Sequence, residues 1–254
     1  MAIASFSLAK LSLLFFGVQD NLVPLFVFFS TVVSYNYIRL TRIKQIDSWF
    51  ANWLNSNKTY LILLSIFSFL GCGYLMLQLK LQALFMLIPF AFLTAIYVIP
   101  PFISKKINLR NLPVVKIFII AISWAGITVL FPLIQYDLFN DEILWLFLRR
   151  FLFVVVLTLP FDIRDVLYDS KSLMTLPIWL GVKKAKILGL VFLMLFLVIE
   201  LFSIKTNHLW IDVFITVCLG SLLLKSSTDQ HKYFSAFWVE GVPILWLGLY
   251  LIFA

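Results

Sequence analysis

Three aspartates in the second half of the chain have a spacing that suits metal and phosphate chemistry. Asp162, Asp165 and Asp169 are three and four positions apart, so on a helix they fall within an arc of about 60° and share one face. Carboxylates on one face repel one another unless a cation lies among them. Mg²⁺ held by such carboxylates and by phosphate oxygens is one solution. The alternative is a solvated loop in which Arg164 and Lys171 neutralise the three charges.

The elements that must position these aspartates are predicted to be membrane helices. The chain has 254 residues, of which 63% are hydrophobic and 13% charged, whereas a soluble domain has about 45–50% apolar and about 25% charged residues. The apolar segments are continuous rather than alternating, which argues against a transmembrane β-barrel and predicts an all-α integral membrane protein. The net charge of +8 then concerns topology, and we expect no nucleic-acid partner.

Nine apolar runs approach the length of about 20 residues that a helix needs to cross a bilayer. They are 4–18, 22–40, 60–79, 81–99, 113–133, 143–161, 185–202, 209–224 and 237–253. About nine transmembrane helices leave no room for a separate soluble domain. We therefore expect residues 1–254 to form a single transmembrane helical domain.

Lys and Arg are distributed unequally between the two sides of this arrangement. Fifteen of them flank the connections after the second, fourth, sixth and eighth runs, whereas Lys80 and Lys205 alone flank the opposite connections. The positive-inside rule therefore predicts a cytoplasmic N-terminus and an external C-terminus. The first run lacks a basic region and a small-residue cleavage site, so we expect a retained helix, as in a multi-pass protein of the bacterial inner membrane.

The aspartates belong to a longer pattern. Asp162-x-x-Asp165-x-x-x-Asp169 is followed by Thr-Leu-Pro-Ile-Trp-Leu-Gly at 175–181. Together these stretches resemble the second aspartate-rich motif, and the tail that follows it, in UbiA-type membrane prenyltransferases. Looser similarity extends over 97–116, which resembles the family's connection between helices four and five, and over the stretch that opens its last helix.

The resemblance implies a UbiA-like bundle that transfers a prenyl group from a polyprenyl diphosphate to an aromatic or other lipophilic acceptor in the membrane. It also implies that Asp162, Asp165 and Asp169 are catalytic and bind Mg²⁺, because the charge of the departing diphosphate must be neutralised. Amide and basic side chains are the further candidates for diphosphate contacts: Asn36, Arg39, Lys44, Lys105, Lys106, Arg110, Lys116, Arg164 and Lys171.

The chain departs from the family at the end of the second run. The family's first motif, Asn-Asp-x-x-Asp-x-x-x-Asp, aligns with the segment that begins at Asn36, but Tyr37, Leu40 and Lys44 replace the aspartates. Magnesium is therefore expected through the second motif only. Either Arg39 and Lys44 contact phosphate directly, or they pair with the remaining aspartates and close an inactive site. The second outcome describes a non-catalytic relative that binds a lipid or diphosphate, or that supports a membrane complex. This basic segment could also be a simple positive-inside anchor.

Two adjacent arginines lie inside the sixth run. Arg149 is seven positions past Glu142, about 10 Å into the helix, where an arginine costs about 2.5–3.5 kcal/mol on the insertion scale. We expect Arg149 and Arg150 to face either a wet cavity or an acid at similar depth, and Glu200 is the acid expected to pair with Arg149. Such arginines could also line the path of a transported solute, but the sequence shows no inverted repeat.

Overall fold

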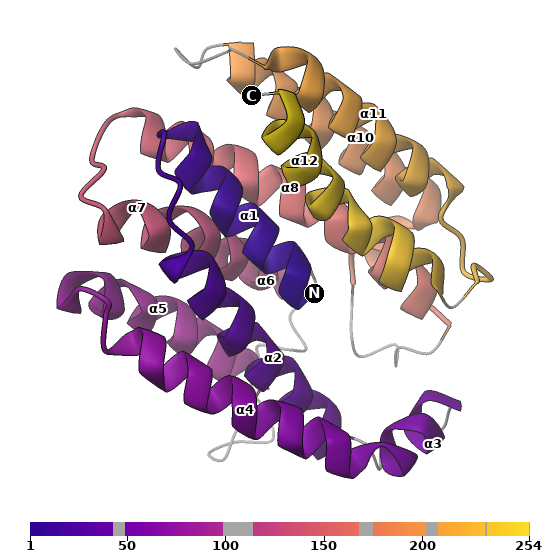
Figure 1. Cartoon of the computed structure of the whole chain (residues 1–254). Coiled ribbons are helices and arrows are strands. Elements are labelled where there is room, and N and C mark those ends of the chain that lie inside the picture. The colour runs from indigo at the N-terminus through magenta and orange to yellow at the C-terminus, as the bar shows by residue number, and fades with distance from the viewer. Residues whose placement is uncertain (43–48, 99–113, 168–174, 202–207, 232, 254) are drawn as a thin grey trace.

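The computed structural model of the chain is a bundle of helices (Figure 1). It describes residues 1–254 except 43–48, 99–113, 168–174, 202–207, 232 and 254, and the described residues contain no β-strand. The elements are, in chain order, α1 (Ala2–Phe15), α2 (Leu22–Arg42), α3 (Trp49–Ser56), α4 (Lys58–Met76), α5 (Leu81–Val98), α6 (Val115–Ala125), η3 (Gly126–Leu130), α7 (Phe131–Gln135), α8 (Glu142–Asp165), α9 (Leu176–Leu180), α10 (Val182–Leu201), α11 (Leu209–Lys225), η4 (Phe234–Val239) and α12 (Glu240–Phe253).

Helix α8 lies inside the bundle, whereas α4 lies at its edge. In an apolar 18-residue stretch of each helix, 61% of the residues of α8 are buried, against 6% in α4. Around α8, the rings of Phe153, Phe196 and Trp246 join α8, α10 and α12, with centroids between 5.0 and 6.0 Å apart. Helix α4 instead exposes large apolar side chains such as Phe67 and Leu70. A helix that is apolar all round and yet exposed suits a lipid environment.

A second hydrophobic core joins the N-terminal helices. It contains Val23 and Phe26 of α2, Ala83 of α5 and Phe131 of α7, and the rings of Phe26 and Phe131 lie 5.5 Å apart. Helix α2 packs along both α1 and α4, and α1 also packs against α12. Helix α1 therefore connects the N-terminal helices to the group formed by α10, α11 and α12 (Figure 1).

The predicted helix over 113–133 consists of three consecutive segments. Helix α6 passes into η3, a π-helix, and then into α7, which ends at Gln135. Gly126 begins the π turn, and Phe90 of α5 packs so closely on it that a Cβ would lie 2.1 Å from a ring atom. Because only glycine lacks that atom, the residue is required here by the close approach of α5.

The all-α prediction is confirmed for the described part of the chain. Five helices within it are long and apolar enough to cross a membrane: Leu22–Leu40, Lys58–Met76, Val115–Gln135, Glu142–Asp165 and Phe234–Phe253. The apolar helices Ala2–Phe15 and Leu81–Thr94 are shorter. Helices α10 and α11 coincide with two further predicted runs. The structure is therefore compatible with a multi-pass membrane protein, and the count of about nine crossings stays a prediction.

Candidate functional site

The acidic residues of interest lie in the last turn of α8. This helix ends at Asp165, and the chain turns at Val166 and Leu167. Asp162 and Asp165 are three residues apart and therefore share a face. Asp162 is 4% exposed, whereas Asp165 is only partly buried. The predicted face of three carboxylates is thus described for its first two members, and Asp169 lies outside the described residues.

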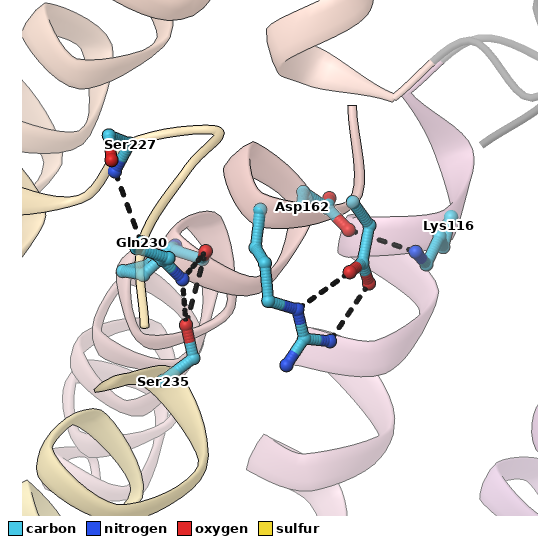
Figure 2. A network of polar contacts seen from close by, with 8 residues as sticks. Lys116, Asp162, Ser227, Gln230 and Ser235 are labelled. Atoms are coloured by element: carbon cyan, nitrogen blue, oxygen red, sulfur yellow. Dashed lines mark hydrogen bonds and ion pairs between the residues drawn. The ribbon is translucent and has the colours of Figure 1, made fainter. Parts of the chain in front are cut away.

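Each of these carboxylates is already held by a cation of the same chain. Lys116, the second residue of α6, donates from Nζ to Oδ1 of Asp162 at 2.9 Å, as Figure 2 shows. Arg164 donates from Nε to Oδ1 of Asp165 at 2.7 Å and from Nη2 to Oδ2 at 3.2 Å. The two-point geometry is the one a guanidinium offers to a carboxylate. Carboxylates and cations therefore alternate at this end of α8 and α6.

The backbone that leads into α6 is strained next to this site. Val114 has φ +70°, a left-handed conformation that a β-branched residue adopts rarely and at a cost of order 1–3 kcal/mol. Its strain comes two residues before Lys116, where the chain enters α6.

A second polar network fixes the loop between α11 and η4 to the same end of α8 (Figure 2). Gln230 donates from Nε2 to the carbonyl of Pro160 at 3.0 Å and also contacts Ser235 Oγ. Ser235 Oγ donates to the same carbonyl at 3.3 Å, and the backbone N–H of Ser227 donates to Gln230 Oε1 at 3.2 Å. The sequence gives no signal for these residues, because isolated Gln and Ser in a short loop are ordinary. They hold the backbone two residues from Asp162.

The other predicted diphosphate contacts divide into three groups. Lys116 and Arg164 lie at the aspartates, as described. Asn36 is buried and donates from Nδ2 to Ser65 Oγ of α4 at 3.1 Å, so its described contact joins two helices rather than meeting α8; Arg39 lies one turn farther along α2 and is partly buried. The remaining predicted residues lie outside the described residues: Lys44, Lys105, Lys106, Arg110, Asp169 and Lys171.

The described carboxylates have the donor chemistry that Mg²⁺ prefers, since this ion binds one or two carboxylates together with water and phosphate oxygens. A metal at Asp162 would take the place of Lys116, and a metal at Asp165 would take the place of Arg164. The described residues contain no group of three or more metal-ligating side chains. Two carboxylates would need further oxygen ligands, from water or from a substrate phosphate, to hold magnesium, so magnesium binding at Asp162 and Asp165 stays a prediction.

The two arginines inside α8 are both buried, but only Arg149 forms ion pairs among the described residues. Arg149 forms ion pairs with Glu200 of α10 and with Asp212 of α11, the second at 2.9 Å between Nη2 and Oδ2. Arg150 donates from Nη2 to Ser12 Oγ at 3.0 Å, and its guanidinium lies 5.2 Å from the centroid of the Trp246 ring. The predicted pairing of Arg149 with Glu200 is confirmed.

Asp212 is the partner that sequence reasoning does not single out. It lies in the first turn of α11, where an acidic residue is expected for the helix dipole alone. A signal is nevertheless present, because Asp212 is an acid inside a long apolar run, as Glu200 is.

The fold and these contacts define a class: an all-helical protein whose apolar helices are compatible with several membrane crossings, with buried charge pairs toward both ends of α8. Comparison with protein-family models, with curated proteins and with solved structures finds no match to this chain. The resemblance to UbiA-type enzymes is therefore carried by the motif residues alone.

Proposed function

We propose that the chain is a UbiA-like membrane prenyltransferase, which transfers a prenyl group from a polyprenyl diphosphate to an aromatic or other lipophilic acceptor. The observation that carries the proposal is the ion pair of half-buried Lys116 with buried Asp162, which joins α6 and α8 at the end of an apolar bundle. A buried charge pair costs desolvation free energy, and Asp165 with Arg164 adds a second pair beside it. Residues of these types suit a charged head group whose lipid tail lies among apolar helices.

In this proposal the two cations at the aspartate site exchange their carboxylate partners for oxygens of the substrate diphosphate. Lys116 and Arg164 donate to diphosphate oxygens, which frees carboxylate oxygens of Asp162 and Asp165. Mg²⁺, when bound, would supply positive charge that neutralises the leaving group. The allylic carbon–oxygen bond breaks, the electron pair leaves with the diphosphate, and the acceptor forms the new bond and releases one proton to water. Positive charge from Lys116 and Arg164 offsets the lost first aspartate motif, because preorganised charge at the leaving group is the main catalytic requirement.

A second candidate is a non-catalytic relative that binds a lipid or a diphosphate, or that supports a membrane complex. Two observations favour it. Both described carboxylates are neutralised by internal cations. Asn36, the residue left from the family's first motif, donates to Ser65 and so serves the packing of α2 on α4.

Binding and turnover assays on the purified protein in lipid nanodiscs distinguish the two candidates. Geranylgeranyl and shorter prenyl diphosphates are supplied with and without Mg²⁺, to the parent chain and to Asp162→Asn and Lys116→Gln variants. The charge-matched control is Asp141→Asn, an exposed residue at the other end of α8. Mg²⁺-dependent diphosphate release that is lost in Asp162→Asn but kept in Asp141→Asn supports the enzyme. Binding without release supports the non-catalytic relative that binds a diphosphate. The absence of binding refutes both the enzyme and the diphosphate-binding relative.

The orientation belongs to the same proposal. The unequal distribution of Lys and Arg favours a cytoplasmic aspartate site and N-terminus, an external C-terminus and a bacterial inner membrane. A reporter fused after residue 254 tests it. Activity of an externally active reporter supports this topology, and activity of a cytoplasmic reporter at the same point contradicts it.

A further inference from the structure

A cavity of about 90 Å³ lies at the end of the bundle opposite to the aspartate site. It is bounded by the last turns of α1, α10 and α12 and by the first turns of α8 and α11. The residues of its wall that matter here are Phe15, Glu142, Trp145, Arg149, Glu200, Asp212 and Tyr250. Arg149 is 13 positions before Asp162 on α8, a separation of about 20 Å along the helix. The two sites are therefore physically distinct.

The wall of this cavity carries more negative than positive charge. Glu142, Glu200 and Asp212 contribute three carboxylates, and Arg149 contributes one guanidinium. Arg149 is shared between Glu200 and Asp212. Glu142 forms no ion pair with any other residue in the described part of the chain. Arg150, the next cation along α8, faces Ser12 and Trp246 and does not line the cavity, but its charge acts on Asp212 of the wall. Three carboxylates then stand against two guanidinium groups.

The helix ends around the cavity do not reverse this balance. Two helix N-termini, of α8 and α11, each contribute about half a positive charge, and three C-termini, of α1, α10 and α12, each contribute about half a negative charge. The backbone therefore leaves the cavity slightly more negative than its side chains make it. An additional cation is the species that this field attracts.

Aromatic rings form the rest of the wall. Tyr250 lies edge-on to Phe15, with centroids 5.1 Å apart, and to His208, with centroids 5.4 Å apart. Trp145 lines the same space and is 44% exposed. Aromatic faces attract organic cations through their quadrupole, and ammonium groups are the ligands that such walls bind in combination with carboxylates. The small volume of the cavity, its carboxylates and its aromatic rings therefore all favour a small organic cation as the ligand.

We propose that this cavity binds an ammonium group, as a small free amine or as the head group of a membrane lipid. Glu142 provides the carboxylate that faces the cation, and Tyr250 and Trp145 provide aromatic faces. The Arg149 ion pairs hold Glu200 and Asp212 in the wall. The volume admits only a few heavy atoms, which favours an ethanolamine- or methylammonium-sized group.

Titration of the purified protein in phosphatidylglycerol nanodiscs, at about 0.15 M KCl to screen non-specific attraction, tests the site. The probes are ethanolamine and tetramethylammonium, with ethylene glycol as the neutral control. We expect saturable binding of a cation that Glu142→Gln weakens about tenfold or more and that Asp141→Asn, one residue away, leaves unchanged. Tyr250→Phe should retain binding and Tyr250→Leu should weaken it.

Several results would overturn the proposal: no binding of either cation by the parent chain, equal affinity for ethylene glycol, or equal affinity in Glu142→Gln and the parent. Nanodiscs that also contain phosphatidylethanolamine separate the two sources of the ammonium group. A lower apparent affinity for ethanolamine in these discs, absent in Glu142→Gln, assigns the site to the lipid head group. An unchanged affinity assigns it to a free amine. Neither result depends on prenyl transfer at the aspartate site.

Discussion

Replacing Arg149 with glutamine is expected to lower the free energy of unfolding by about 3–5 kcal/mol, the usual cost of removing one partner from a buried ion pair. The structure indicates a loss of unfolding free energy toward the upper end of this range. Arg149, Glu200 and Asp212 are each 5% exposed, so the substitution leaves two buried carboxylates facing each other without a cation. For a chain of this size, about 2–4 °C per kcal/mol converts the loss to a fall in Tm of about 6–20 °C.

A double-mutant cycle with Glu200→Gln measures the pairing itself. Each variant is unfolded by equilibrium SDS titration from mixed micelles, followed by circular dichroism, with Lys184→Gln on the exposed face of α10 as the control. The double variant should lose less than the sum of the single variants, by about 0.5–3 kcal/mol, because the residues are in contact. The unfolding free energy of Arg149→Lys should lie between those of the parent and Arg149→Gln. A lysine ammonium keeps the positive charge but cannot donate to two carboxylates with the fixed planar geometry of a guanidinium. Additive losses, within about 0.3 kcal/mol, would refute the pairing.

Three further outcomes are expected. Gly126→Ala should lose about 1–3 kcal/mol of unfolding free energy, because its Cβ would enter a ring, whereas Gly73→Ala, with no atom within 4 Å of the new Cβ, should change little; equal losses in the same SDS titration would contradict the close packing. The Tyr136 hydroxyl and a backbone N–H donate to Asp20 and lower the pKa of its carboxyl. The ionised carboxylate therefore stabilises the folded state at pH values above the unfolded pKa of about 3.9. This stabilisation is lost as pH falls through the lower folded pKa. The Tm difference between the parent and Asp20→Asn should therefore shrink as pH falls below about 4, and a pH-independent difference would contradict this reasoning. Gln230→Leu removes one of the two hydrogen bonds to the Pro160 carbonyl, so it should cost about 0.5–1.5 kcal/mol and should increase proteolysis between α11 and η4. Unchanged proteolysis would show that the network does not hold this loop.

The positions of the helices follow from the sequence because lipid imposes a simple rule. A backbone in hydrocarbon must satisfy its own hydrogen bonds, so each long apolar run becomes a helix. Helix α2 begins at Leu22 and helix α11 begins at Leu209, and each of these residues is also the first of the corresponding apolar run. The same rule predicts that Arg149 finds an acid, because an unpaired arginine at that depth is costly.

Other features of the structure depend on how the helices pack, and the lengths of the apolar runs in the sequence do not predict that packing. The π turn at Gly126 arises where Phe90 approaches from another helix. The network of Gln230 depends on a loop that meets α8 only in three dimensions. For the aspartate motif, the helical spacing argument holds for Asp162 and Asp165 in the last turn of α8, whereas Asp169 lies outside the described residues. Whether these residues act on a diphosphate stays a prediction.

The Arg149 ion pairs also constrain the order in which the protein can be made. Synthesis runs from the N-terminus at about 5–20 residues per second, and Asp212 follows Arg149 by 63 positions. For about 3–13 s, Arg149 has therefore been synthesised while Asp212 has not. During that interval Arg149 lacks the carboxylate of Asp212, whereas Ser12, the hydrogen-bond partner of Arg150, is already present. The last third of the chain thus completes the environment of a helix made well before it.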